Sequence, residues 1–281
     1  MPKRAARRWI RRICEAMRLI DLKDPLLESI YAAANELKIT RQHDPGASTR
    51  DAISTYIKRI PYETRVQGSE PIYSILNYIP NEESTKLLTS LKGKGPYIVN
   101  PEHLDHLLRQ VVVACRRIIV DVKPDVIVYP SSSSGLLKKF VGMLHETYPT
   151  IAVGGEAFVK KILKAGDEEA LINTKHPDWE KFAREHPKSV VELKRSLKNH
   201  LSDGVLELKK LYKPYLKFIK NFIELKNAAQ TLDQVIDQNV LVVDDVLSSG
   251  ATMLEMFRQL REFEPKSLSG LTIFKRTSDL H

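Results

Sequence analysis

VLVVDDVLSSGAT, at residues 240–252, is the stretch of this chain that predicts most about its architecture. Residues 240–243 are apolar and mostly β-branched, which is typical of a strand buried on both faces of a parallel sheet. Asp244 and Asp245 follow this strand, then come small residues, and then a helical pattern over 253–263. The stretch therefore predicts a strand, a turn and a helix in succession.

The turn between this strand and this helix is suited to bind a phosphate group. Small residues let backbone N–H groups crowd around an anion, the helix N-terminus adds partial positive charge, and hydroxyl groups supply further donors. The paired acids would repel a phosphate, so we expect them to accept hydrogen bonds from sugar hydroxyls or to interact with a metal ion that the ligand brings. The turn consists of Ser248, Ser249, Gly250, Ala251 and Thr252.

The same stretch resembles the phosphoribosyl pyrophosphate (PRPP) signature of the type I phosphoribosyltransferases. It shares four apolar residues, two acids, two spacers and a five-residue loop that ends in Thr. The resemblance implies that Asp244 and Asp245 bind the ribose 2′- and 3′-hydroxyls, and that residues 248–252 hold the 5′-phosphate. The stretch is not a Walker loop, because the Gly-Lys-Ser/Thr ending is absent, and it is not a dinucleotide fingerprint, because it has one glycine. The alternative is an ordinary strand-to-helix turn that carries two solvated acids.

A second strand, turn and helix occur earlier in the chain. Residues 124–135 read PDVIVYPSSSSG, with a buried strand predicted over 126–129 and a helix over 136–148. This segment resembles the family's pyrophosphate loop, which implies that it donates N–H and hydroxyl hydrogen bonds to pyrophosphate. It departs from the family because it contains no Arg or Lys, although Lys138 and Lys139 follow within a turn. The loop residues are Ser131, Ser132, Ser133, Ser134 and Gly135.

Further strands complete the predicted core. One is expected over 150–158 and another over 267–274. Lys160 and Lys161 follow the first of them, where a basic residue of the family often reaches the pyrophosphate, so the resemblance implies this role for them; simple surface lysines are the alternative. Strands that alternate with helices predict a doubly wound α/β fold with a mainly parallel sheet and the ligand at the carboxyl ends of the strands.

Two segments do not fit this core pattern. Residues 1–95 read as a mostly helical N-terminal subdomain, and the core over 96–281 is interrupted by a helical insertion over about 166–238. We expect the insertion to cap the site; dimerisation of the chain and binding of an acidic partner are the alternatives. The helices predicted before and within the core lie at 26–37, 49–60, 82–91, 102–120, 178–185, 190–211 and 214–227, with irregular structure over 61–80.

The first predicted helix, over residues 3–18, is basic and amphipathic. The chain has a formal net charge of +9, which attracts polyanions such as nucleic acid and phosphorylated small substrates. Two interpretations are open. In the first, the apolar stripe of this helix packs on the rest of the protein and its basic face is exposed to solvent. In the second, the basic face contacts nucleic acid or an acidic protein. The basic residues proposed for such a contact are Arg7, Arg8, Arg11 and Arg12.

The composition favours a cytoplasmic protein without a membrane span. No apolar run approaches the ~20 residues that a spanning helix needs. Cys14 and Cys115 are far apart and lie in apolar or helical patterns, which is typical of reduced core thiols rather than of a disulfide or metal site.

The resemblance implies a pentosyltransferase of nucleotide metabolism. It would bind PRPP with Mg²⁺ and transfer the 5-phosphoribosyl group to an unidentified acceptor, with release of pyrophosphate. Mg²⁺ is carried largely by substrate phosphates, so we expect few protein ligands. Asp244 or Asp245 would contact the metal directly or through a water molecule. Family enzymes for 6-oxopurines usually carry an acid at the position of Ser248, so hypoxanthine and guanine are disfavoured as acceptors.

The rival hypothesis is a protein of this fold that is not a working enzyme. It would be a regulator or a defence-system effector that binds PRPP or a nucleotide, together with nucleic acid or a protein partner, with little turnover. The basic first helix, the unusual insertion and the loop without a basic residue favour this reading. A PRPP synthetase is excluded, because it would need two such domains and an ATP site.

Overall fold

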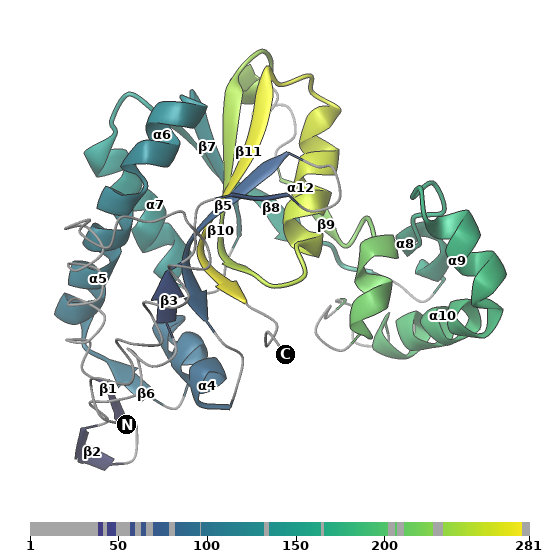
Figure 1. Ribbon diagram of the computed structural model, residues 1–281, viewed down its shortest axis with the longest axis horizontal. Helices are drawn as coiled ribbons and strands as arrows, with labels where there is room; N and C mark the ends of the chain where they lie inside the picture. The colour runs from purple at the N-terminus through teal and green to yellow at the C-terminus, as the bar shows by residue number, and fades with distance from the viewer. Residues whose placement is uncertain are drawn as a thin grey trace, which may run out of the picture.

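A computed structural model describes most of the chain after residue 70 and four short strands before it (Figure 1). The helices predicted over 3–18 and 26–37, with Arg7, Arg8, Arg11 and Arg12, lie outside the described residues. Every helix within the described residues is too short or too polar to cross a membrane. The described residues are 39–41, 44–48, 57–59, 63–65, 70–78, 82–95, 97–131, 135–163, 166–201, 206, 211–226 and 233–276.

Within these residues the core is an eight-stranded, mainly parallel sheet, which confirms the predicted fold class (Figure 1). The inner strands β5, β11, β10, β7 and β8 are parallel, and the short edge strands pair antiparallel. Across the sheet the order is β3 (Ile57–Arg59), β5 (Pro71–Tyr78), β11 (Ser267–Arg276), β10 (Asn239–Leu247), β7 (Val126–Pro130), β8 (Ala152–Lys160) and β9 (Ile223–Leu225), while β4 (Glu63–Arg65) also pairs with β5.

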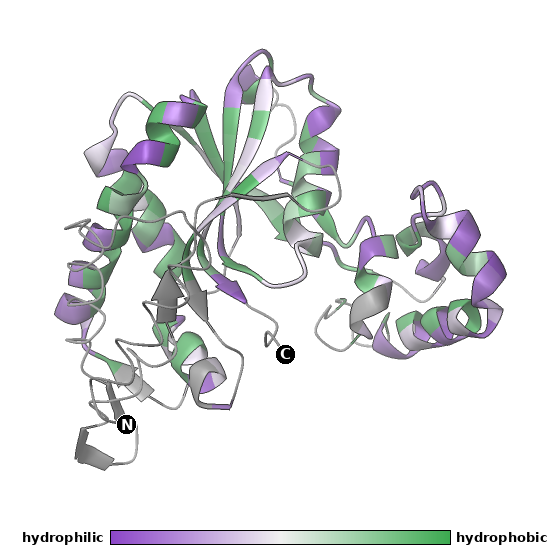
Figure 2. Ribbon diagram, viewed as in Figure 1, coloured by the Kyte–Doolittle hydropathy of each residue, from purple (hydrophilic) through white to green (hydrophobic). Residues whose placement is uncertain are grey.

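Helices cover both faces of this sheet, as a doubly wound fold requires. Leu241 and Val243 of β10 belong to one buried cluster with residues of α5 and α7, whereas Val240 and Val242 belong to a second cluster with α12. Successive side chains of a strand point to opposite faces, so the apolar run is buried on both sides. Figure 2 shows the resulting apolar strands between helices with polar outer sides. The covering helices are α4 (Glu82–Leu91), α5 (Pro101–Ala114), α6 (Arg116–Val122), α7 (Gly135–Thr147) and α12 (Ala251–Arg261).

Local sequence explains where the helix predicted over 102–120 begins and ends. The Oδ1 atom of Asn100 accepts hydrogen bonds from the backbone N–H groups of Glu102 and His103, and Pro101 occupies the first turn, where a missing N–H group is tolerated. The segment forms two helices, α5 and α6, that meet at Cys115. The predicted single helix is therefore interrupted, although its buried face is as expected.

The segment before residue 95 contains strands where helix or irregular structure was predicted. The helix expected over 49–60 is wrong at β3, and the irregular structure expected over 61–80 is wrong at β4 and β5. β5 pairs in parallel with β11, almost 200 residues later, so no local pattern could reveal it. Pro71 is its first residue, a strand position that tolerates proline. The core sheet thus begins before residue 95, while β1 (Ile39–Arg41), β2 (Asp44–Ser48) and β6 (Tyr97–Val99) form a separate small sheet.

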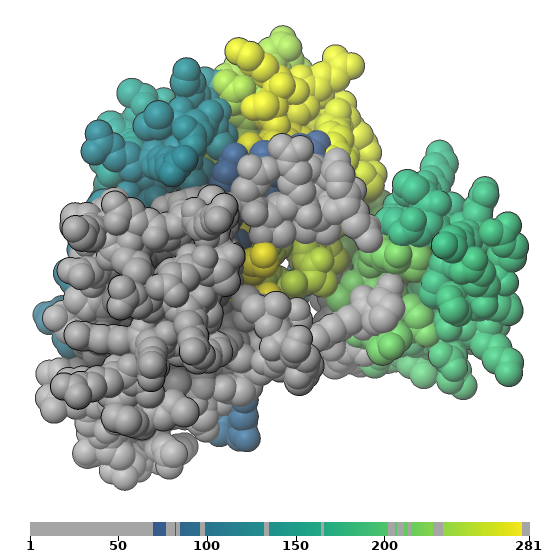
Figure 3. All heavy atoms as spheres, viewed as in Figure 1, coloured from purple at the N-terminus to yellow at the C-terminus, as the bar shows by residue number. Residues whose placement is uncertain are grey.

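The described residues of the insertion form helices and one strand, β9. The helix predicted over 178–185 is confirmed, and the one predicted over 190–211 ends at Leu201. The helix predicted over 214–227 is wrong, because β9 in this segment pairs antiparallel with the end of β8. Figure 3 shows the insertion as a lobe beside the C-terminal part of the core. Its helices are α8 (Glu168–Leu171), α9 (Trp179–Glu185), α10 (Pro187–Leu201) and the 3₁₀ helix η2 (Lys213–Phe218).

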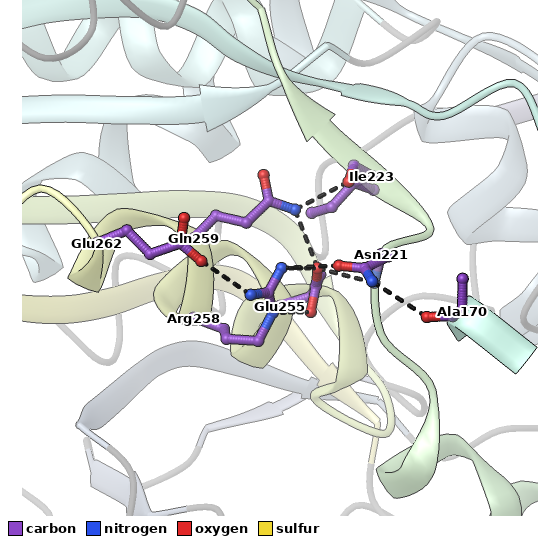
Figure 4. Close-up of polar contacts among 7 residues, drawn as sticks. All are labelled: Ala170, Asn221, Ile223, Glu255, Arg258, Gln259 and Glu262. Atoms are coloured by element: carbon purple, nitrogen blue, oxygen red, sulfur yellow. Dashed lines mark hydrogen bonds and ion pairs between the residues drawn. The ribbon is translucent and has the colours of Figure 1, made fainter. Parts of the chain in front are cut away.

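A polar network fastens this lobe to α12 (Figure 4). The buried carboxylate of Glu255 accepts hydrogen bonds from the backbone N–H of Asn221, from Gln259 Nε2 and from the guanidinium of Arg258, each at 2.9 Å. Arg258 also donates to Asn221 Oδ1 at 3.0 Å, and Asn221 Nδ2 donates to the carbonyl of Ala170 at 3.0 Å. Asn221 has a φ of +56°, a left-handed conformation that Asn tolerates better than most residues. The lobe is therefore held to the core by buried, charge-assisted contacts.

Replacing Glu255 tests whether this network holds the lobe. We expect Glu255→Ala to lower the free energy of unfolding by about 2 kcal/mol, because it leaves the Asn221 backbone N–H, Gln259 Nε2 and part of the Arg258 guanidinium without their acceptor. Glu262→Gln is the matched control, since it removes only the exposed partner of Arg258 and should change stability by less than about 0.5 kcal/mol. Urea unfolding measures both, and equal stability of the two variants would contradict the assignment.

Candidate active site

The two predicted binding turns lie at the same edge of the sheet. β7 and β10 are parallel neighbours, with Val126, Ile127 and Val128 opposite residues 240–242. β10 runs through a turn into α12, and β7, which ends at Pro130, is followed by α7 from Gly135. Because the carboxyl ends of parallel neighbours meet at one edge, the two turns can face one ligand.

The turn after β10 has the backbone that a phosphate site needs. Gly250 has a φ of +79°, a conformation that side-chain-bearing residues rarely adopt, and α12 begins directly after it. The N–H of Ala251 donates to Ser249 Oγ at 3.4 Å, and the first N–H groups of any helix lack partners within it. Ser248 and Ser249 are exposed, whereas Ala251 is buried and Thr252 is half-buried. The five residues predicted to hold the 5′-phosphate therefore follow one another around a helix N-terminus.

The two acids lie inside β10 rather than after it. The strand was expected to end at residue 243, but it continues to Leu247, because its pairing with β11 extends to Leu247 opposite Lys275. Asp245 is buried and Asp244 is half-buried, and the backbone N–H of Asp245 donates to Asp244 Oδ1 at 2.8 Å. The pair is thus held rigidly by the sheet, directly before the phosphate turn.

Lys92 is a site residue that the sequence analysis missed. Its ammonium lies 2.8 Å from Oδ1 and 2.7 Å from Oδ2 of Asp245, so it contacts both carboxylate oxygens. Lys92 follows α4 directly, and 153 positions separate it from Asp245. No spacing or motif in the sequence could have joined these two residues. The contact balances the charge of Asp245.

The pKa of Asp244 is raised above that of an ordinary aspartate. Burial and the neighbouring carboxylate of Asp245 raise the pKa of Asp244 to about 7, and the backbone hydrogen bond and the Lys92 charge oppose this rise. Near neutral pH the group therefore exchanges a proton easily. Ligand groups that favour the ionised form, such as sugar hydroxyls or a divalent cation, would lower this pKa again.

The turn after β7 is only partly described. Ser131 and Gly135 flank it, and Ser132, Ser133 and Ser134 lie outside the described residues. Ser131 Oγ donates to Glu156 Oε2 at 3.1 Å, and Lys138 Nζ lies 2.8 Å from Glu156 Oε1. Lys139 forms an ion pair with Asp105 of α5. The two lysines that follow the loop thus point to different partners.

Other basic residues gather at the same edge of the sheet. Lys160 is the last residue of β8 and is exposed, and Lys161 is half-buried next to the β8–β9 pairing. Lys275 near the end of β11 lies opposite Leu247, beside the phosphate turn, and burial lowers its pKa. Lys275 is a second residue to which the sequence analysis gave no role.

Comparisons with known proteins agree with the signature. Residues 202–280 match the family described as the phosphoribosyl transferase domain. A search of curated proteins finds no significant match. Similar solved structures include a glutamine mutant from an analysis of an invariant aspartic acid in HPRTs, with 11% identity, 64% of this chain and 73% of that chain covered, and a TM-score of 0.33.

Two further solved structures are similar to the same extent. The hypoxanthine phosphoribosyl transferase of Trypanosoma cruzi has 12% identity, with 64% of this chain and 70% of that chain covered and a TM-score of 0.33. The hypoxanthine-guanine phosphoribosyltransferase of Bacillus anthracis has 15% identity, with 65% of this chain and 76% of that chain covered and a TM-score of 0.32. At such TM-scores these likenesses carry no further argument.

The family match covers the segment that contains β10, the phosphate turn, α12 and β11. It includes residues 240–252, one of the two segments from which the family was predicted, and it agrees with the predicted enzyme class, a phosphoribosyltransferase among the pentosyltransferases. Residues 202–280 are therefore similar to the phosphoribosyl transferase domain family.

Proposed function

We propose that this protein binds PRPP with Mg²⁺ between the turns after β7 and β10 and transfers the 5-phosphoribosyl group to an acceptor, with release of pyrophosphate. The observation that carries this proposal is the acid pair Asp244–Asp245 in β10, directly before the turn at Gly250 and on the strand that pairs in parallel with β7. A ligand with phosphate at both ends and a sugar between them matches this order of groups.

Each part of the site has a role in this proposal. Residues 248–252 hold the 5′-phosphate, and the acids accept hydrogen bonds from the ribose hydroxyls. The turn after β7, with Ser131 and Gly135 at its ends, holds the pyrophosphate, assisted by Lys160 and Lys161 at the end of β8. Lys275 adds positive charge beside the phosphate turn.

The proposed reaction makes mainly electrostatic and positional demands on the protein. A nucleophile displaces pyrophosphate at the anomeric carbon, and positive charge develops on the sugar as the bond breaks. The turns orient the two phosphate ends and keep the sugar carbon in line for attack, while a covered site excludes water. The negative charges of Asp244 and Asp245, in contact with the ribose hydroxyls, would stabilise the positive charge that develops on the sugar.

The donor set fits Mg²⁺ that arrives with its substrate. Asp245 already contacts Lys92 with both oxygens, so Asp244 is the carboxylate more open to a cation. No group of three or more His, Cys, Asp or Glu among the described residues is placed to hold a metal ion. Mg²⁺ often takes one or two carboxylates and completes its shell with water and substrate phosphates, and it would neutralise charge on the leaving group.

The acceptor is not a 6-oxopurine in this proposal. Ser248 is exposed and stands where the family's enzymes for these bases usually carry an acid. The insertion, fastened to α12 by the Glu255 network, lies at the sheet edge that carries β8 and β9 and is our candidate for a cover over the acceptor. We place the reaction in cytoplasmic nucleotide metabolism.

A screen for pyrophosphate release over free bases and other acceptors tests the activity. We expect release with one acceptor, and a loss of about two orders of magnitude or more in Asp244→Asn/Asp245→Asn, because the ribose contacts are lost. Asp121→Asn, an exposed acid on α6, is the control and should keep full activity. PRPP binding without release for any acceptor would favour the regulator or effector over the enzyme, and unchanged release in the double variant would contradict the site.

The raised pKa of Asp244 predicts a pH dependence of binding. Below pH 7 the free protein holds a proton on this carboxyl, and a ligand that favours the ionised form expels it. Affinity for PRPP with Mg²⁺ should therefore rise between pH 6 and pH 8, with release of up to about one proton below pH 7. Calorimetry in two buffers of different ionisation enthalpy measures the proton count.

The variant Asp244→Asn distinguishes protons released by Asp244 from protons released by the ligand. The ligand's phosphate groups titrate in the same range, but they do so equally with both proteins. The variant should release fewer protons than the native chain at pH 6.5. An equal count in the two proteins would show that Asp244 does not ionise on binding.

The basic segment over residues 3–18, predicted to be helical, is proposed to contact a separate partner, nucleic acid or an acidic protein. Charge reversal or removal there should leave PRPP binding unchanged, because the site is built from residues after position 90. Replacing Arg7, Arg8, Arg11 and Arg12 with Gln should weaken salt-dependent binding of nucleic acid by about tenfold or more. Electrophoretic shift at several salt concentrations measures this, and unaltered nucleic-acid binding would remove the proposal.

A further inference from the structure

Glu156 is an acid at the position where the proposed function requires cations. It lies on β8, beside the strand that precedes the pyrophosphate loop, and its side chain is 22% exposed. Its two oxygens contact Ser131 Oγ at 3.1 Å and Lys138 Nζ at 2.8 Å. Ser131 begins the loop and Lys138 lies in the first turn of α7, so both contacts are donors of the loop segment itself.

The backbone of β8 is shaped to aim this side chain. Val128 lies opposite Gly155 and Tyr129 opposite Glu156, but Ile127 lies opposite Val153 and Pro130 opposite Phe158. The register thus skips one residue before Glu156 and one after it. Bulges of this kind redirect side chains and are frequent beside active sites.

The glycines before Glu156 make the first irregularity possible. Gly155 has a φ of +83°, which a residue with a side chain rarely adopts. A Cβ atom on Gly154 would lie 3.0 Å from both Val128 Cγ1 and Gln234 Oε1. Two adjacent glycines, Gly154 and Gly155, therefore allow the backbone irregularity that directly precedes Glu156.

The ion pair does not have the features of a stabilising contact. Lys138 is 59% exposed, and pairs between an exposed lysine and a carboxylate contribute little to stability. Glu156 is nevertheless an anion: the hydrogen bond from Lys138 is the main reason that its pKa lies below the ordinary value, although burial opposes it. A fixed negative charge on the loop's donors opposes the binding of any other anion there.

We propose that Glu156 is an internal anion that occupies the Ser131 hydroxyl and the Lys138 ammonium in the free protein, and that the pyrophosphate group of a ligand displaces it. This inference rests on the proposed function, because it assigns pyrophosphate to this loop. Displacement frees Lys138, which then supplies the positive charge that the loop, without Arg or Lys of its own, does not contain. The charge of Lys226, which also lowers the pKa of Glu156, compensates the released carboxylate.

The exchange makes pyrophosphate binding weaker than the loop alone would allow. A ligand held by both turns also binds through its 5′-phosphate and ribose. The free energy of these additional contacts offsets the loss of the Glu156 contacts. Free pyrophosphate binds through this loop only. Glu156 therefore favours release of the product after the transfer step.

Titration of inorganic pyrophosphate into the full chain, with and without Mg²⁺, tests the proposal. Glu156→Gln keeps the size of the side chain and removes its charge, so we expect pyrophosphate to bind about tenfold more tightly. Glu156→Asp, whose shorter side chain cannot reach both donors, should also bind more tightly. Glu224→Gln, an exposed acid on the neighbouring strand β9, is the matched control and should bind as the native chain does.

The outcomes separate this proposal from the proposed function. Equal or weaker pyrophosphate binding in both Glu156 variants overturns the displacement and makes Glu156 a support for Lys138. If PRPP binds to the native chain in that case, the proposed function stands. If neither PRPP nor pyrophosphate binds to the native chain or to any variant, both proposals are overturned.

Discussion

The parallel pairing of β7 with β10 is the constraint on which the rest of the structure depends. It brings together the ends of two strands that lie more than 100 residues apart, and with them two turns that lead into helices. Helix N-termini and small residues make both turns favourable for anions. A register that differed by one residue would exchange the faces of the sheet on which Asp244 and Asp245 lie. The site is therefore a consequence of sheet register rather than of any single loop.

The edge of the sheet formed by β7, β8 and β10 carries lysines, which attract an anion, and acids, which repel it. Lys92 compensates Asp245, and burial together with the neighbouring carboxylate of Asp245 raises the pKa of Asp244. On the other side of β7, Glu156 compensates Lys138 in the same way. Both acids are held by strands, whereas both lysines have long, flexible side chains. The lysine ammonium groups can therefore follow a ligand, which suits the proposed binding and release of polyphosphates.

Strand and turn patterns predicted much of the core, since each depends on neighbouring residues. The apolar run of β10, the turn at Gly250 and the helices α4, α7 and α12 could all be predicted locally. β5 could not, because its partner β11 is remote and its prolines and tyrosines suggested a loop. Lys92 and Glu156 were missed for a related reason: their contacts depend on long-range packing and on two bulges that no motif marks. The strand β9 was mistaken for helix, because its pairing with β8 outweighs a helical apolar spacing.

The central claim is that the edge formed by β7 and β10 is a PRPP site, and calorimetric titration of the native chain with PRPP, with and without Mg²⁺, tests it most directly. The account predicts saturable binding to one site per chain, tighter in the presence of Mg²⁺, and competition by a ribose 5-phosphate that occupies the turn after β10. Absence of binding up to about 1 mM PRPP, with and without the metal, would contradict it.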